Sequence, residues 1–101
     1  MSIEEFITAV SQEKFVEAHE LLEEEWKYYK RIEEKSKAKA VQGLINGATA
    51  LALYKKNRPD AYVRIWKVFK KNKILIEELD NNEKYHEASI LLELKNKSIT
   101  N

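Results

Sequence analysis

The sequence has no cysteine, one proline and two glycines among its 101 residues. Without cysteine, the chain cannot form internal disulfide bonds, use thiolate catalysis or ligate zinc or an iron–sulfur cluster through thiolates. A reducing, intracellular setting fits this composition. A chain of this length is sufficient for one domain, which buries about 60 to 70% of the surface that its unfolded form exposes. We therefore expect a single domain over residues 1–101.

Targeting and cofactor motifs are also lacking. The first ten residues, MSIEEFITAV, are acidic and amphipathic, whereas a secretory signal has a basic segment followed by an apolar one. They are also too few for a membrane span, which needs about 20 apolar residues. There is no glycine-rich phosphate loop, nucleophile elbow or dinucleotide fingerprint. We expect a soluble, cytoplasmic protein with no membrane contact, and we assign it no cofactor.

Charge is distributed unevenly along the chain. Residues 1–34 hold ten Glu and four basic residues, a net charge of −6, whereas residues 35–73 hold eleven Lys or Arg and one Asp, a net charge of +10. Residues 74–101 carry a net charge of −3. Such segregation favours pairing between regions, either within one subunit or between two, so a homo-oligomer is a candidate assembly.

Abundant Glu, Lys, Ala and Leu, with few helix breakers, predict an all-α fold. Apolar residues recur every three or four positions between about 13 and 31, which predicts one amphipathic helix there. Similar patterns predict a shorter helix before it, a helix over about 35–56, another after Pro59 with an irregularity near Asn72, and a last one around Tyr85. The expected architecture is a small antiparallel bundle of four to five helices with a frayed tail from about residue 96.

Two glycines stand four residues apart inside the predicted 35–56 helix, at Gly43 and Gly47. Each costs a helix about 1 kcal/mol relative to alanine. Close approach of a neighbouring helix backbone is the compensation we expect. The sequence leaves open whether that neighbour belongs to the same subunit.

The segment HELLEEEW, residues 19–26, is the most distinctive local feature. His19 and Glu23 are four residues apart and hence neighbours on a helix surface, with Trp26 one turn further along. A glutamate beside an imidazole fixes its tautomer for base catalysis or metal binding. The structural alternative is a mostly buried histidine that is hydrogen-bonded to Glu23 or to the next helix.

Residues 40–54 contain no charged side chain, yet this segment carries Gln42, Asn46 and Thr49 at spacings of four and three. These residues form a polar stripe beside an apolar helix face. If the stripe meets His19 and Glu23, the result is a hydrogen-bond network that either fixes the packing or lines a pocket. The sequence leaves both interpretations open.

Two further patterns receive weaker interpretations. Glu83 and His86 have the three-residue spacing of di-iron bundles, but the chain offers one such pair and no HExxH motif, so we assign no metal site and expect His86 to face solvent. Lys67, Lys70 and Lys71 share one side of a helix and form a possible phosphate-binding surface within the basic 55–73 segment. We expect this basic face to complement the glutamate-rich helix instead of binding nucleic acid.

The chain resembles a known family in two helices. The residues that carry the resemblance are Phe15, Glu17, Ala18, His19, Glu20, Glu23 and Trp26, followed by Gln42, Gly43, Leu44, Ile45, Asn46 and Ala48. This pairing of a His-Glu-x-x-Glu-x-x-Trp helix with a Gln-Gly-Leu-Ile helix resembles the domain of unknown function 309 family over roughly residues 11 to 70. The resemblance implies a small helical fold and one shared feature built from His19, Glu20, Glu23, Gln42 and Asn46, and it implies no activity. The chain departs from the family pattern at Asn46, where a second glutamine is common, and at Asp60, where a glycine is.

Three functional hypotheses follow. The leading one is a helical module that binds a small molecule or peptide in a polar pocket near His19, lined by Glu20, Glu23, Trp26, Gln42 and Asn46. The second is a hydrolase-like or metal-assisted enzyme that uses His19 with Glu23. The third is an acidic-partner or nucleic-acid surface on the basic 55–73 segment.

Overall fold

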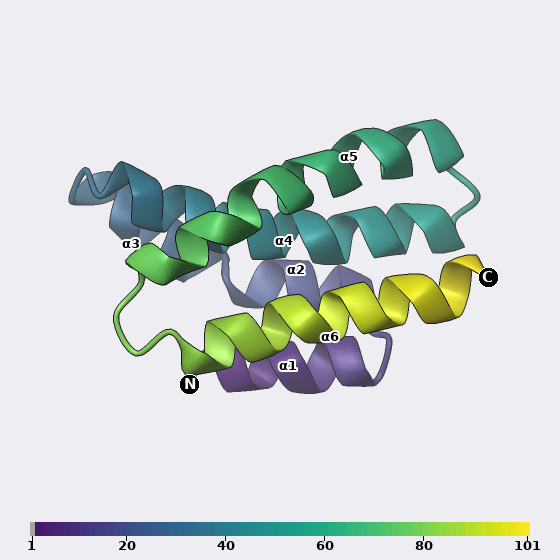
Figure 1. Cartoon of the computed structure of the whole chain (residues 1–101), viewed down its shortest axis with the longest axis horizontal. Helices are drawn as coiled ribbons and strands as arrows, with labels where there is room; N and C mark the ends of the chain where they lie inside the picture. Colours follow the sequence, from purple (N-terminus) through teal and green to yellow (C-terminus); the bar gives the residue numbers. More distant parts are fainter. Residues whose placement is uncertain (1) are drawn as a thin grey trace.

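The computed structural model describes residues 2–101, which contain helices and no strands (Figure 1). In chain order the elements are α1 (Ser2–Ser11), α2 (Phe15–Leu21), α3 (Glu23–Arg31), α4 (Lys35–Lys55), α5 (Pro59–Asn72), the 3-10 helix η1 (Lys73–Glu78) and α6 (Glu83–Thr100). The predicted all-α bundle is confirmed. None of the helices in residues 2–101 combines the length and apolar character that crossing a membrane requires.

The single helix expected over about 13–31 is wrong, because the chain breaks at Leu22 into α2 and α3. Leu22 has φ −103° and ψ 0° and is fully buried. Glu23, Glu24 and Glu25 then occupy the first turn of α3, where the positive end of the helix dipole favours carboxylates. If α2 and α3 are counted as one interrupted segment, the bundle has five α-helical segments.

Helix α4 is the centre of the bundle. It packs against α2, α3, α5 and η1 and also contacts α6, and Figure 1 shows it between α5 and α2. Its length follows from its composition, since 21 residues contain no proline. One apolar cluster of buried side chains joins helices α1, α2, α4, α5 and α6. Its fully buried members include Phe6, Leu22, Leu44, Phe69 and Leu92.

Gly43 and Gly47 face other helices of the same subunit. A Cβ added at Gly43 would lie 2.9 Å from the Cβ of Asn72 on α5. At Gly47 it would lie 2.8 Å from Leu92 Cδ1 on α6 and 3.1 Å from Phe69 Cδ1 on α5. The expected close approach is confirmed, and it occurs within the subunit.

Left-handed residues other than glycine end three of the helices. Glu13, Glu33 and Asn57 have φ values of 59°, 58° and 59°. The amide of the next residue in each case bonds to a carbonyl five residues back, as in Lys14 to Ala9 at 2.8 Å. This is the hydrogen-bond pattern of the Schellman motif, in which glycine is usual at the left-handed position. Both glycines of this chain are used inside α4 instead.

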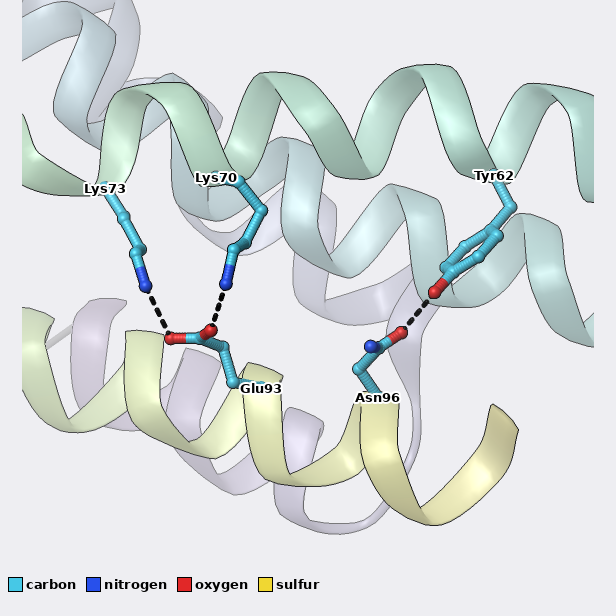
Figure 2. Close-up of polar contacts among 5 residues, drawn as sticks. All are labelled: Tyr62, Lys70, Lys73, Glu93 and Asn96. Atoms are coloured by element: carbon cyan, nitrogen blue, oxygen red, sulfur yellow. Dashed lines mark hydrogen bonds and ion pairs between the residues drawn. The ribbon is translucent and has the colours of Figure 1, made fainter. Parts of the chain in front are cut away.

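The C-terminal third contains one confirmed feature and one correction. The irregularity expected near Asn72 is confirmed, because α5 ends there and the 3-10 helix η1 follows. The frayed tail expected from about residue 96 is wrong, since α6 continues to Thr100. The Tyr62 hydroxyl on α5 donates a 2.5 Å hydrogen bond to Asn96 Oδ1 and so holds the end of α6 against the bundle (Figure 2).

Candidate functional site

Four of the six predicted site residues line one small hollow between α3 and α4. Glu23 and Trp26 come from α3, and Gln42 and Asn46 come from α4, together with Ile45. The hollow has a volume of about 120 Å³, and all of these side chains are half-buried. The packing of α3 against α4 therefore brings together two motifs that lie about 20 residues apart in the chain.

A second, larger hollow shares Trp26 and Gln42 with the first. Its volume is about 440 Å³, and the residues that line it include Tyr29, Lys30, Glu33, Lys35 and Lys39. This size falls within the range of about 300 to 1,000 Å³ that is usual for small-molecule sites. We refer to the two hollows together as the α3–α4 groove.

The charge and shape of the α3–α4 groove favour a particular kind of ligand. Three lysines line the larger hollow against one glutamate, Glu33. Lys30 Nζ lies 4.3 Å from the centroid of the Trp26 ring, a cation–π contact. Burial, reinforced by the nearby Glu25 carboxylate, raises the pKa of Tyr29, so its phenol is a neutral hydrogen-bonding group at physiological pH. The groove thus offers flat apolar surface beside surplus positive charge.

His19 and Glu20 do not line the groove. His19 is half-buried on α2, and its Nδ1 is hydrogen-bonded to the carbonyl oxygen of Val16 one turn earlier. Glu20 is exposed to solvent. Within residues 2–101 no hydrogen bond or ion pair joins His19 to Glu23, because the break at Leu22 interrupts the helical register that would place them side by side.

The condition for the hydrogen-bond network is not met, because within residues 2–101 no hydrogen bond joins Gln42 or Asn46 to His19 or Glu23. Gln42 and Asn46 are half-buried at the groove, and the Thr49 hydroxyl donates a 2.9 Å hydrogen bond to Ile45 O of its own helix. In the part of the chain that the structure describes, no buried side-chain nitrogen or oxygen lacks a partner. The polar stripe thus borders a groove and is not sealed in the core.

His86 pairs with a residue that the sequence did not single out. Its Nε2 lies 2.8 Å from Glu77 Oε1 near the end of η1, and its side chain is 39% exposed, so it faces solvent in part. Across residues 2–101 no group of three or more histidine, aspartate or glutamate side chains is arranged to hold a metal ion.

The predicted basic surface is divided by the fold. Lys70 Nζ lies 2.6 Å from Glu93 Oε1 on α6, and Lys73 Nζ lies 3.0 Å from Glu93 Oε2 (Figure 2). Lys67 and Lys71 remain exposed. The acidic complement of Lys70 is therefore α6. Lys55 of the same basic segment pairs with Glu13 of the glutamate-rich segment at 2.7 Å, so the expected complementarity is met in part.

Comparison with known families places these observations in context. The family described as Domain of unknown function (DUF309) matches residues 3–65. The chain belongs to the DUF309 family. Comparison with curated proteins and with solved structures gives no match.

The DUF309 match covers every residue of the α3–α4 groove and ends within α5. Lys67, Lys70 and Lys71 lie beyond it, as do η1 and α6. The C-terminal segment nevertheless completes the hydrophobic core, since Ala88 and Leu92 are fully buried. The DUF309 match thus contains the candidate site but not the whole fold.

Sequence reasoning missed several groove residues, namely Tyr29, Lys30, Glu33, Lys35, Ala38 and Lys39. Tyr29 follows Trp26 by three residues and so falls on the apolar pattern predicted for residues 13–31. A usable signal was present, because Lys30 follows Trp26 by one helical turn and Lys35 precedes Lys39 by one turn. Which neighbouring helix these side chains face depends on the tertiary packing.

Proposed function

We propose that this DUF309 protein binds a small molecule in the α3–α4 groove, and that the ligand carries an anionic group beside a flat apolar part. One observation carries the proposal. Glu23, Trp26, Gln42 and Asn46, which the sequence singled out, line a hollow that shares Trp26 and Gln42 with a larger, lysine-rich one.

The side chains of the groove match the two parts of this ligand class. Trp26 and Tyr29 offer aromatic faces for a flat group. The lysines of the larger hollow supply charge for an anion, and the amides of Gln42 and Asn46 supply both donors and acceptors in the smaller one. Mostly apolar walls with a few convergent polar groups are typical of small-molecule sites.

An NMR screen of a library of aromatic carboxylates and aryl phosphates tests the proposal. The protein has two tryptophans, so the indole N–H signal of Trp26 reports on the groove and that of Trp66 on α5 serves as an internal control. We expect members of the library to shift the Trp26 indole and the Gln42 and Asn46 side-chain amides in a saturable way. Shifts confined to other regions, or none across the library, would contradict the proposal.

A matched pair of variants separates the groove from general electrostatic attraction. Lys39→Met removes a cation of the groove, and Lys67→Met removes an exposed cation on α5. We expect the first change to weaken binding of an aryl phosphate about tenfold, the effect of losing one charge-assisted hydrogen bond. The second change should leave binding unaltered.

The other sequence-based hypotheses differ in their support. A catalytic role for His19 with Glu23 is not favoured, because no hydrogen bond joins the two side chains within residues 2–101 and only Glu23 lines the groove.

We also propose that the chain acts as one domain, in the cytoplasm, and that it self-associates. The single apolar cluster supports one domain, the absence of cysteine supports the cytoplasm, and the opposite net charges of residues 1–34 and 35–73 support self-association.

A further inference from the structure

The outer face of α6 carries aliphatic side chains where a surface helix normally carries polar ones. Among the large hydrophobic side chains of residues 2–101, the three most exposed are Ile74 at 73%, Ile90 at 59% and Leu94 at 57%. Two of them belong to α6, whose opposite face buries Ala88 and Leu92 in the core. Exposed apolar side chains that gather in this way mark interaction surfaces. Figure 1 shows α6 along the front of the bundle, with no other helix drawn in front of it.

Charged residues flank this aliphatic pair in a symmetric order. Glu87, Ile90, Leu94 and Lys97 follow one another at spacings of three, four and three, so they form one stripe along α6. All four are exposed. Ile90 and Leu94 lie equally far before and after Leu92, and so do Glu87 and Lys97. The stripe therefore has an acidic end, an aliphatic centre and a basic end.

We infer that α6 is a homodimer interface, in which the helix packs antiparallel against α6 of a second copy about a two-fold axis that passes beside Leu92. In this arrangement Ile90 of each copy meets Leu94 of the other, and Glu87 of each meets Lys97 of the other. A two-fold interface must be self-complementary, and the order of residues in the stripe satisfies this condition. Parallel packing would instead oppose Glu87 to Glu87 and Lys97 to Lys97.

The charged residues of the stripe are available for such pairing. The only ion pair of Glu87 within residues 2–101 is to Lys84 of the same helix, at 3.7 Å with both side chains more than half exposed, and exposed pairs of this kind contribute little. Lys97 has no ion pair in the same range of residues.

The neighbouring surface extends the apolar contact. Ile74 on η1 and Ile90 line a hollow of about 590 Å³ whose other walls include Lys70, Lys73 and Glu93, so a side chain of the second copy has a partly polar recess to enter beside the helix pair. The surface that a single helix pair buries is small compared with the roughly 1,200 to 2,000 Å² that stable interfaces bury. The dimer is therefore weak and depends on protein concentration. This inference places the self-association proposed above on α6, outside residues 1–34 and 35–73, and does not depend on ligand binding in the α3–α4 groove.

Sedimentation velocity of the full chain without ligand, at low salt and over a wide range of concentration, tests the inference. We expect a monomer–dimer equilibrium, and we expect Ile90→Glu to raise the dimer dissociation constant at least about tenfold, because it places two buried charges against Leu94. Lys67→Glu, an exposed change on α5, is the control and should leave the equilibrium unaltered. A wild type that is monomeric at every concentration overturns the inference, as does a dimer that Ile90→Glu leaves intact.

Charge exchange tests the antiparallel register itself. Glu87→Lys and Lys97→Glu each oppose like charges twice across the interface, and each should weaken dimerisation about tenfold or more. Mixing the two variants should restore dimers as heterodimers, because every introduced charge then meets its opposite. Failure of the mixture to associate more strongly than either variant alone overturns the antiparallel arrangement. Circular dichroism checks that each variant keeps its helices.

Discussion

The Tyr85 hydroxyl on α6 donates a hydrogen bond to the Glu25 carboxylate on α3, across 60 residues of sequence. Tyr85 is buried, and that burial, together with the bond to Glu25, raises the pKa of its phenol well above the ordinary value. The hydroxyl is thus a permanent donor at physiological pH. This bond joins α3, which lines the α3–α4 groove, to α6, which lies outside the DUF309 match.

We expect Tyr85→Phe to lower the free energy of unfolding by about 1 to 3 kcal/mol, because the partly buried Glu25 carboxylate loses its donor. Urea denaturation measures this change. Tyr28→Phe is the matched control, since Tyr28 is an exposed tyrosine on α3. If both substitutions changed the free energy of unfolding equally, the Tyr85–Glu25 hydrogen bond would contribute no more than an exposed tyrosine hydroxyl does.

Gly47 should not tolerate alanine, although helix propensity alone predicts a gain of about 1 kcal/mol. The added Cβ would lie 2.8 Å from Leu92 Cδ1 and 3.1 Å from Phe69 Cδ1. Both neighbours are fully buried, and overpacking of a core costs about 1 to 3 kcal/mol. We expect a net loss of stability in thermal or urea unfolding, while the exposed control Ser36→Ala stays near the wild type. A stabilised Gly47→Ala would contradict the close approach.

Glu93 should contribute a pH-dependent part of the stability. Burial pushes its pKa up, but the bonds from Lys70 and Lys73 outweigh burial and leave the pKa below the ordinary value. A carboxylate with a depressed folded pKa stabilises the fold above its unfolded pKa, about 4.3, and loses that contribution as pH falls through the folded value. Glu93→Gln should therefore be less stable than the wild type at pH 7, with a difference that shrinks below about pH 4.3.

Urea unfolding of both proteins at a series of pH values measures this difference. Glu78→Gln is the control, because Glu78 is exposed and makes no ion pair within residues 2–101. If the difference in free energy of unfolding between the wild type and Glu93→Gln stayed constant down to low pH, the role of Lys70 and Lys73 would be contradicted.

Glu33 should be replaceable by glycine with a gain in stability. Its φ of 58° lies in the left-handed region, which costs an L-residue with a Cβ roughly 1 to 2 kcal/mol. Glycine removes most of this cost but has more conformational freedom to lose on folding, so we expect Glu33→Gly to raise the free energy of unfolding by about 0.5 to 1 kcal/mol. Glu13→Gly is the informative contrast. It relieves the same strain but removes the ion pairs of Glu13 with Lys55 and Lys95, so it should gain less or lose stability in the same urea assay.

Sequence periodicity predicted most of the fold because helices depend on local properties. The stripe through Phe15 and Ala18, the turn at Pro59 and the irregularity near Asn72 follow from residues within a few positions of one another. The break at Leu22 was missed, although three successive glutamates are a signal for a new helix start. The continuation of α6 to Thr100 was missed, and the contact of its last turns with Tyr62 spans 34 residues, which local periodicity does not report.

What the sequence determined by itself is the helical class, the near absence of breakers, the two glycines of α4 and the set of Glu23, Trp26, Gln42 and Asn46 as residues of interest. What the tertiary structure decided is which of these residues meet. The break at Leu22 places His19 and Glu23 in separate helices, with His19 hydrogen-bonded to Val16, and the packing of α3 on α4 added Tyr29, Lys30 and Lys39 to the site. The physical reason is that spacing along a helix sets which side chains share a face, whereas the neighbour of that face depends on burial summed over the whole chain.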